Sequence, residues 1–246
     1  MSKKLDLRVQ REGTIINKIS SKQEKLLLNA IERVAEEVYR KFPFVKLVWK
    51  KDLHLVDVIN ALRLSFPDVS FASPMSSSTM RPDGGFLYIE AIDGAHYPIL
   101  IAEKKNQGTN DIRAKEGKKK QAKGNAIERL GKNVIGLRAA LLSENIFPFV
   151  CFGDGCDFAE GSSIIDRVIT IAMFGDLNVE HLHNIRNFNR GTFYFREKPW
   201  TENEMFEFSL NVAISSIYYY FSKYGENNFR VQKNDKSWNM KYLVNV

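Results

Sequence analysis

Three charged residues, Asp83, Glu103 and Lys105, stand at positions where a β-hairpin would bring their side chains together. Asp83 lies shortly before the strand-like run FLYIEAI, and Glu103 and Lys105 follow a second strand-like run, YPILIA. Residues 93–96 (DGAH) separate the two runs and are typical of a hairpin turn. The spacing therefore predicts an antiparallel ribbon whose open end holds two carboxylates and one ammonium group.

The same turn predicts the register of this ribbon. Gly84 is expected opposite Lys105, and Phe86 opposite Glu103. Because side chains alternate along a strand, Glu103 and Lys105 share one face of the ribbon while Lys104 points to the other. The carboxylate of Glu103 emerges from an apolar run, and burial of a charge there is costly unless another group pairs with it.

These residue types suit phosphodiester hydrolysis assisted by a divalent metal ion. Asp83 and Glu103 supply the hard oxygen ligands that Mg²⁺ prefers, and Mg²⁺ keeps several waters when only one or two carboxylates hold it. Lys105 has two alternative roles: it stabilises the charge that develops on the phosphorus, or it helps to position and deprotonate the attacking water. Pro-Asp-Gly is also common in turns and Glu-Lys-Lys at strand ends, so a structural interpretation of both strings stays open.

A second concentration of charge lies between residues 113 and 132, where eight basic residues face two acids. This segment runs into a predicted helix start at Gly124 and Asn125. A helix start presents unpaired N–H groups and the positive end of the helix dipole, so the combination is predicted to attract phosphates. The structural alternative is a solvated tether, with Asn125 as an N-cap and Arg129 as an ion-pair partner. The residues expected to contact a nucleic-acid backbone are Arg113, Lys115, Lys118, Lys119, Lys120 and Lys132.

The pentapeptide NAIER occurs twice, at residues 29–33 and 125–129. The first copy lies in a segment whose apolar residues recur at steps of three and four, which predicts an amphipathic helix over residues 21–41. Its polar residues are therefore expected on a solvated helix face. The second copy follows the basic segment and opens a new apolar repeat, so its context is the one that indicates function.

The elements that position these residues alternate between strand and helix. Strand-like runs (FLYIEAI, YPILIA, FPFVCF, RVITIAMF and GTFYFRE) are separated by predicted helices near residues 55–62 and 125–143, and the run MFEFSLNVAISSIYYYFSKY is also predicted to be helical. This order predicts the α/β class, with a central mixed sheet flanked by helices. The length of 246 residues fits one domain over residues 1–246, with residues 1–20 as a flexible tail.

Composition and charge limit the classes of binding partner and the cellular location that we expect for this protein. The formal net charge of +7 admits an anionic partner. No apolar stretch approaches the roughly 20 residues of a membrane span, and the first residues lack the apolar centre of a signal peptide, so we expect a cytoplasmic protein without membrane contact. Cys151 and Cys156 are expected to be reduced thiols, and no histidine stands at zinc-ligand spacing from them.

Three strings, MRPDGGFLYIEAIDGAHYPILIAEKKNQG, GNAIER with KN soon after it, and LLSENIFPFVCF, resemble the EcoRI family of type II restriction endonucleases in order and interval. The resemblance spans about residues 76–158 and implies a restriction-endonuclease-like (PD-ExK) core. It implies that Asp83, Glu103 and Lys105 form the catalytic site, with Asp83 and Glu103 as ligands of Mg²⁺. It also implies a homodimer that acts on double-stranded DNA and a cognate DNA methyltransferase that protects the host.

The resemblance further implies that the GNAIER helix start reads an AATT core in the major groove through Asn125, Glu128 and Arg129. The chemistry agrees, since an Asn amide pairs with the adenine edge and an Arg donates to purine acceptors, each contact contributing about 1 to 3 kcal/mol of discrimination. Ala126 is expected to pack against a thymine methyl. Glu128 is implied to bridge adenine amino groups across the two subunits.

The residues just before GNAIER depart from those of EcoRI, which are small or apolar. Gln121, Ala122 and Lys123 stand there, and a family member that cuts CAATTG has a basic residue at the position of Lys123. The outer base pair therefore stays open among GAATTC, CAATTG and bare AATT. EcoRI has alanine at the position of Lys104, whose side chain is expected to face away from the metal and to leave catalysis intact.

The predicted function is a Mg²⁺-dependent endonuclease that cuts both strands of a short palindrome. Two alternatives remain at this point: a sequence-specific DNA-binding protein that does not cleave, and a repair or recombination nuclease with the same catalytic core but no sequence readout.

Overall fold

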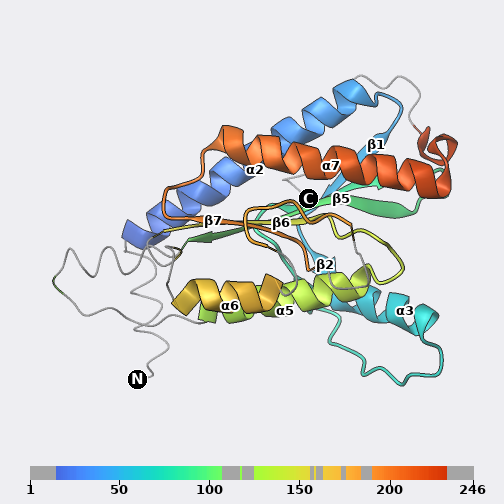
Figure 1. Ribbon diagram of the computed structural model, residues 1–246. Coiled ribbons are helices and arrows are strands. Elements are labelled where there is room, and N and C mark those ends of the chain that lie inside the picture. Colours follow the sequence, from blue (N-terminus) through green and yellow to red (C-terminus); the bar gives the residue numbers. More distant parts are fainter. Residues whose placement is uncertain are drawn as a thin grey trace.

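A five-stranded mixed β-sheet forms the centre of the computed structural model, which describes residues 15–106, 117, 125–155, 158, 163–172, 176–183 and 190–231 (Figure 1). In spatial order its strands are β1 (Lys46–Lys50), β4 (Gly85–Glu90), β5 (His96–Asn106), β6 (Phe149–Asp154) and β7 (Thr192–Arg196). The first three pair antiparallel, and β5, β6 and β7 pair parallel. Two short strands, β2 (Leu53–His54) and β3 (Thr79–Met80), form a separate antiparallel pair.

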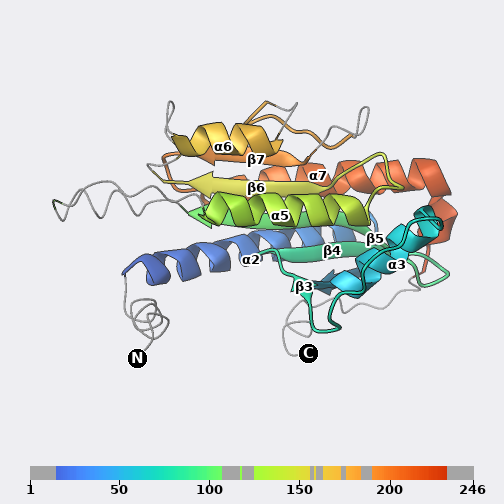
Figure 2. The same cartoon turned by 90° about the horizontal axis from the view of Figure 1, so that it is seen from below.

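Helices cover both faces of the five-stranded sheet. One layer contains α2 (Ile15–Lys41) and α7 (Glu202–Tyr224), and the opposite layer contains α3 (Leu55–Ser65), α5 (Asn125–Ala140) and α6 (Ser163–Ala172), as Figures 1 and 2 show. A short 3₁₀ helix, η3 (Glu226–Phe229), follows α7. The predicted α/β architecture, a mixed sheet flanked by helices, is confirmed.

Two hydrophobic clusters lie on the two faces of the sheet, and β4 shows why the strands are apolar throughout. Leu87 and Ile89 belong to the cluster under α2 and α7, whereas Phe86 and Tyr88 belong to the cluster under α5 and α6. A strand with helices on both sides buries successive side chains in different layers, so its sequence reads as a continuous apolar run. All four side chains are buried.

The predicted helices near residues 21–41 and 55–62 and in the run ending FSKY are present, although α2 begins earlier, at Ile15. The helix α7 starts with a capping box in which the side chain of Thr201 accepts from the Glu204 N–H and the Glu204 carboxylate accepts from the Thr201 N–H. Its aromatic residues belong mainly to the core, because Tyr220 is fully buried and donates to the Pro98 carbonyl oxygen at 3.1 Å.

The prediction of a strand over RVITIAMF is wrong, because this run lies mostly in α6. Ile164, Val168 and Ala172 are buried at a spacing of four, whereas Arg167 and Ile169 are exposed. That pattern buries one stripe of a helix and does not alternate as a half-buried strand does. The fifth strand of the sheet is instead β7, which the run GTFYFRE predicted correctly.

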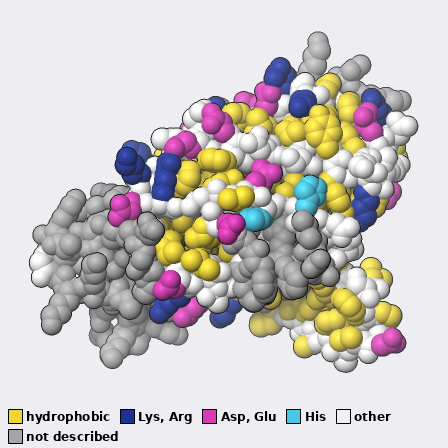
Figure 3. Space-filling view, in the orientation of Figure 1, with side chains coloured by type: hydrophobic (Ala, Val, Ile, Leu, Met, Phe, Trp, Pro, Cys, Tyr) yellow, Lys and Arg dark blue, Asp and Glu magenta, His cyan; other side chains and the backbone are white. Residues whose placement is uncertain are grey.

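Several large hydrophobic side chains are exposed near α3. The end of α3 and the segment after it expose Leu64, Phe66, Val69 and Met75, and Figure 3 shows hydrophobic side chains gathered there. None of the described helices combines the length and apolarity that a bilayer crossing requires.

Candidate active site

The hairpin of β4 and β5 forms as predicted, but its register differs. Phe86 pairs with Ile101 and Gly85 with Ala102, so the expected pairs of Phe86 with Glu103 and of Gly84 with Lys105 are wrong. The loop runs over residues 91–95 because the Ala91 N–H already donates to the Ala95 carbonyl oxygen. A register shift between Leu87 and Tyr88 brings the pairing one residue closer to the predicted register at the end of the hairpin that holds the charged residues.

Two glycines, Gly84 and Gly85, allow strand β4 to begin directly after Asp83. The Gly84 N–H donates to the Ala102 carbonyl oxygen at 2.9 Å, and a Cβ atom on Gly84 would lie 2.8 Å from the Ala102 Cβ. Gly85 has a φ of 69°, and a Cβ there would lie 2.7 Å from the Lys50 carbonyl oxygen. Glycine at both positions lets the Asp83 backbone approach the end of β5 closely.

The structure brings Asp83, Glu103 and Lys105 into one cluster. The Lys105 Nζ contacts both carboxylates: it is 3.5 Å from the Asp83 Oδ2 and donates to the Glu103 Oε1. The Asp83 N–H donates to the Glu103 Oε2 at 3.1 Å, and the Lys104 N–H donates to the Asp83 Oδ2 at 3.1 Å. Both the side chains and the backbone therefore fix the relative positions of the two carboxylates.

Burial and mutual interaction shift the pKa values of the charged groups in this cluster. Glu103 is 2% exposed, and the loss of solvation raises the pKa of its carboxyl group, with the Asp83 charge acting in the same direction and Lys105 against it. Burial alone would lower the pKa of Lys105, but the carboxylates of Glu103 and Asp83 outweigh it and raise that pKa above its ordinary value. Lys105 is therefore an ammonium ion at neutral pH, held between two acids.

Side chains on the opposite face of β5 form a second, buried network that the sequence did not indicate. The Lys104 Nζ donates to the Asp154 Oδ2 at 2.6 Å, and the Asn106 amide donates to the Asp154 Oδ1 at 2.8 Å and to the Gln23 Oε1 at 3.1 Å. The predicted direction of Lys104, away from Glu103 and Lys105, is thus correct. Asp154 ends the apolar run FPFVCFGD, and an acid at the end of a buried strand was the only available signal for it.

Glu24 of α2 is a further acid near the cluster that sequence reasoning missed. Burial raises the pKa of its carboxyl group, the Asp83 charge raises it further, and Lys105 lowers it. One helical turn later, the Leu27 Cδ2 lies 3.2 Å from the position of a Cβ on Gly84, so this face of α2 packs against the start of β4. Nothing in the polar string KQEK distinguishes Glu24 from its neighbours.

The predicted helix start at Asn125 is confirmed, and α5 begins at the edge where β5 ends, as a crossover between two parallel strands requires (Figure 2). Glu128, Arg129 and Lys132 are exposed, whereas Ile127 faces the core. The side chains of Asn125 and Ala126 lie outside the described residues. So do the other residues predicted to contact DNA, namely Arg113, Lys115, Lys118, Lys119, Lys120, Gln121, Ala122 and Lys123, together with Cys156.

The two copies of NAIER have different surroundings. In the first copy, Asn29 donates to Glu202 at 3.1 Å, and Arg33 donates to Glu202 and to Asn203 at 3.3 and 3.0 Å. The Arg33 guanidinium also lies 4.1 Å above the ring of Phe206. This polar face therefore packs against α7. The prediction that it faces only solvent is wrong.

In the second copy, the exposed side chains of Glu128 and Arg129 form no hydrogen bond or ion pair with another described residue. The first copy thus connects α2 to α7. In the second copy, the Glu128 and Arg129 side chains have no bonding partner among the described residues.

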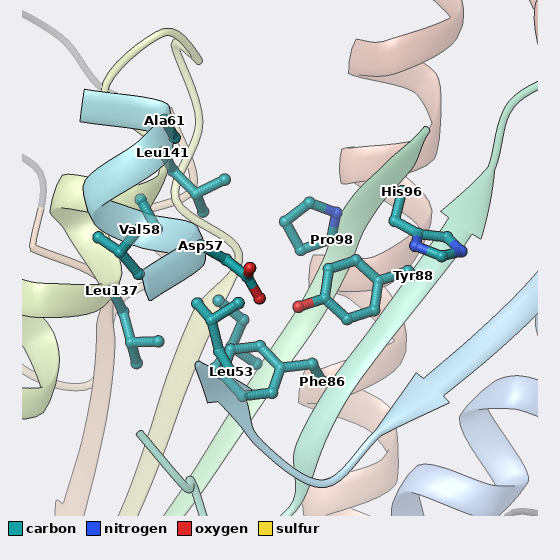
Figure 4. A pocket seen from close by; sticks show the side chains of 12 residues that line it. Leu53, Asp57, Val58, Ala61, Phe86, Tyr88, His96, Pro98, Leu137 and Leu141 are labelled. Atoms are coloured by element: carbon teal, nitrogen blue, oxygen red, sulfur yellow. The ribbon is translucent and has the colours of Figure 1, made fainter. Parts of the chain in front are cut away.

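An apolar cavity of about 160 Å³ lies apart from this cluster, between α3, α5 and the hairpin (Figure 4). The hydroxyl of Tyr88 and the carboxylate of Asp57 point toward each other across it. Burial raises the pKa of the Tyr88 hydroxyl, and the Asp57 charge adds to the effect. None of the predicted site residues lines this cavity, so it offers no alternative position for the predicted chemistry.

Comparison with known proteins agrees with the strings that first indicated this site. A family model described as restriction endonuclease EcoRI matches residues 10–171, which is more than half of the chain. The chain is 29% identical over 241 residues to the type II restriction enzyme RsrI of Cereibacter sphaeroides, covering 83% of this chain and 87% of that protein. It is also 29% identical over 142 residues to the type II restriction enzyme EcoRI of Escherichia coli, covering 54% of this chain and 51% of that protein. With the mixed sheet, the hairpin and a family match over most of its length, the chain belongs to the EcoRI restriction endonuclease family.

Proposed function

We propose that this protein is a Mg²⁺-dependent type II restriction endonuclease that hydrolyses double-stranded DNA at a short palindrome with an AATT core. The observation that supports cleavage best is the contact of one ammonium group, that of Lys105, with the carboxylates of both Asp83 and Glu103. Three groups of the types needed for phosphodiester hydrolysis converge at the end of one hairpin.

The donor set fits a Mg²⁺ ion. Two carboxylates are what this ion uses when it keeps several waters, and no group of three or more His, Cys, Asp or Glu side chains in the described part of the chain offers a fuller cage. The Asp83 side chain is 27% exposed and its Oδ1 accepts no hydrogen bond from a described residue, which leaves an oxygen open to a hydrated ion. Asp83 and Glu103 would hold the metal, which would supply Lewis acidity and an acidified water.

The residues of the chain itself then have separate tasks. The backbone N–H groups of Asp83 and Lys104 hold the two carboxylates in position. Lys105 is protonated in the geometry described, since its pKa is raised by Glu103 and Asp83. Its contact with both carboxylates places Lys105 beside the proposed metal position, where it stabilises the charge that develops on the phosphate or helps to position and deprotonate the attacking water.

Sequence readout is assigned to the start of α5. Glu128 and Arg129 are exposed and uncommitted to described residues, and α5 begins at the same edge of the sheet as the catalytic cluster. Asn125 and Ala126 complete the group of residues that read the bases. Phosphate contacts are proposed for Arg113, Lys115, Lys118, Lys119, Lys120 and Lys132, and contacts next to the outer base pair for Gln121, Ala122 and Lys123.

A homodimer of single-domain subunits matches the two-fold symmetry of a palindrome. We place this enzyme in the cytoplasm, with a DNA methyltransferase as its genetic partner.

The test is digestion of a DNA library with the purified protein and Mg²⁺, followed by sequencing of the ends. Cleavage at sites that share AATT supports the proposal, and the ends also identify the outer base pair and the overhang. Uniform cleavage at unrelated sequences would instead indicate a repair or recombination nuclease. Specific binding without cleavage under any divalent ion would indicate a DNA-binding protein.

Two single variants and a matched control assign the roles. Asp83→Ala and Lys105→Ala should bind AATT-containing DNA but fail to cut it. Asp52→Ala is the control, because the Asp52 side chain is also 27% exposed and also pairs with one cation, Arg81, at 2.8 Å. Its loss should leave the cleavage rate unchanged. Normal cleavage by Asp83→Ala would refute the assignment of the site.

A further inference from the structure

The end of β5 is held from both faces, and only one face has been assigned a role. Glu103 and Lys105 point into the proposed site, whereas Lys104 and Asn106 point to the other side and bond to Asp154. The side chains of Lys104 and Asp154 are 3% and 2% exposed, so this is a fully buried ion pair.

Lys104 links the two faces through its own atoms. Its side chain ends on Asp154, while its backbone N–H donates to the Asp83 Oδ2 at 3.1 Å. A shift of this residue along or out of the strand would therefore move the hydrogen bond that orients the Asp83 carboxylate. No other backbone N–H donates to the Asp83 carboxylate among the residues described.

Asp154 in turn ties β5 to the neighbouring strand β6 and to the segment that precedes α7. It lies in β6, directly opposite Asn106 in the parallel pairing. Its Oδ2 also accepts from the Trp200 N–H at 3.1 Å, next to the cap that begins α7. Asn106 extends the network to Gln23 in α2. The two carboxylate oxygens of Asp154 thus accept from three donors, which leaves this side chain little freedom to move.

A buried ion pair is a poor source of net stability but a strong constraint. Taking both charges out of water costs about as much as their attraction returns, whereas removing one partner leaves an uncompensated charge and is strongly destabilising. Burial lowers the pKa of Lys104 and the Asp154 charge opposes that shift. The pair is therefore better explained by the position that it imposes on β5 than by stabilisation of the fold.

We propose that Asp154 is a positioning residue for catalysis: through Lys104 and Asn106 it sets the end of β5, and so the orientation of the Asp83 carboxylate in the proposed nuclease site. This inference rests on the proposed nuclease function. It also revises the expectation that Lys104 has no bearing on catalysis, because the side chain that faces away from the site is the one that anchors the strand.

The experiment compares Asp154→Asn, the double variant Lys104→Met/Asp154→Asn and the control Glu144→Gln. Glu144 is also a buried acid that pairs with a lysine, Lys223, and accepts from two tyrosine hydroxyls, but it does not contact β5 through these bonds. The measurements are the single-turnover cleavage rate on AATT-containing DNA, the affinity for that DNA, the melting temperature, and hydrogen exchange at the Lys104 amide in metal-free protein.

Asp154→Asn should lower the cleavage rate by about 10- to 100-fold, the range typical of lost supporting contacts around a metal site, without weakening DNA binding. Exchange at the Lys104 amide should become faster. The double variant removes the buried unpaired charge, so its melting temperature should recover while its cleavage rate stays low. Glu144→Gln should lower the melting temperature but leave the rate and the Lys104 exchange unchanged.

The double variant keeps the inference testable even when Asp154→Asn alone does not fold. A wild-type cleavage rate in the double variant, or unchanged Lys104 exchange in both variants, would overturn the positioning role. A wild-type protein that cleaves no DNA with any divalent ion overturns the proposed function instead, and the exchange measurement in metal-free protein still reports whether Asp154 holds β5.

Discussion

The two copies of NAIER allow one substitution to be made in two settings. Arg33→Ala removes an ion pair to Glu202 at 3.3 Å, a hydrogen bond to Asn203 and a guanidinium that lies 4.1 Å above Phe206. A partly exposed ion pair contributes 0 to about 1 kcal/mol and an exposed cation–π contact about 0.5 to 1 kcal/mol. The Arg33 side chain is 38% exposed, so solvent screening favours the lower end, and the expected loss is about 0.5 to 1 kcal/mol.

Arg129→Ala should behave in the opposite way. Its side chain is exposed and forms no hydrogen bond or ion pair with a described residue, so its removal should change the free energy of unfolding by less than about 0.5 kcal/mol. If Arg129 reads a base, its loss should reduce discrimination between AATT and altered sites by about 1 to 3 kcal/mol, or roughly 5- to 150-fold.

Thermal denaturation and fluorescence anisotropy measure the two effects separately. Arg33→Ala should lower the melting temperature by roughly 2 to 4 °C for each kcal/mol lost and leave the affinity ratio for AATT over scrambled DNA unchanged. Arg129→Ala should lower that ratio and leave the melting temperature unchanged. The reasoning is refuted if Arg33→Ala changes the affinity ratio, or if Arg129→Ala leaves it at the wild-type value.

Three further predictions follow from the geometry. Gly85→Ala places a Cβ 2.7 Å from the Lys50 carbonyl oxygen at a φ of 69°, so urea denaturation should show a loss of about 1 to 3 kcal/mol. The hydrogen bonds from Arg196, together with those from Thr201, lower the pKa of Glu204 to about 2. A depressed acid stabilises the fold above its unfolded pKa, so Glu204→Gln should melt earlier than wild type at pH 7, and the difference should disappear as the pH falls from about 4.5 toward 2; a difference that persists at pH 2 would contradict this cause. Removal of Mg²⁺ with EDTA should stop cleavage without abolishing specific DNA binding, and added Mg²⁺ should restore it, whereas cleavage in EDTA would exclude a metal-dependent site.

The clustering of Asp83, Glu103 and Lys105 was predictable because hairpin geometry is local. Two apolar runs and one turn signal bring Asp83 back to Glu103 even when the register is wrong by two residues, because a shift of that size still leaves Asp83 beside residues 103–105. The exact register was not predicted, because it depends on where the Ala91 N–H finds its acceptor and on an extra residue, Ile99, in β5. Pro98, next to it, was the only available signal of such an irregularity.

Other features depend on contacts between distant segments. RVITIAMF contains β-branched residues that suit a strand, and only packing of Ile164 and Val168 against the core shows that it is mostly helical. Asp154 and Gln23 meet β5 from different parts of the chain. A single sequence does not show which residues of distant segments contact one another. The buried network of Lys104, Asn106, Asp154 and Gln23 was therefore not predicted.

The edge of β5 changes character where its charged residues begin. Pairing with β4 ends at Ala102, while pairing with β6 continues to Asn106, so no described strand covers the other edge of residues 103–106. Open strand edges promote association between molecules, and charged side chains, lysine above all, prevent it. Here the Lys104 side chain is buried and that of Lys105 is largely buried, and the edge N–H is satisfied within the chain instead, because the Lys104 N–H donates to the Asp83 Oδ2 at 3.1 Å. Replacement of Asp83 by alanine would release this edge N–H, so the self-association of that variant should be measured by light scattering before its cleavage rate is compared with that of wild type.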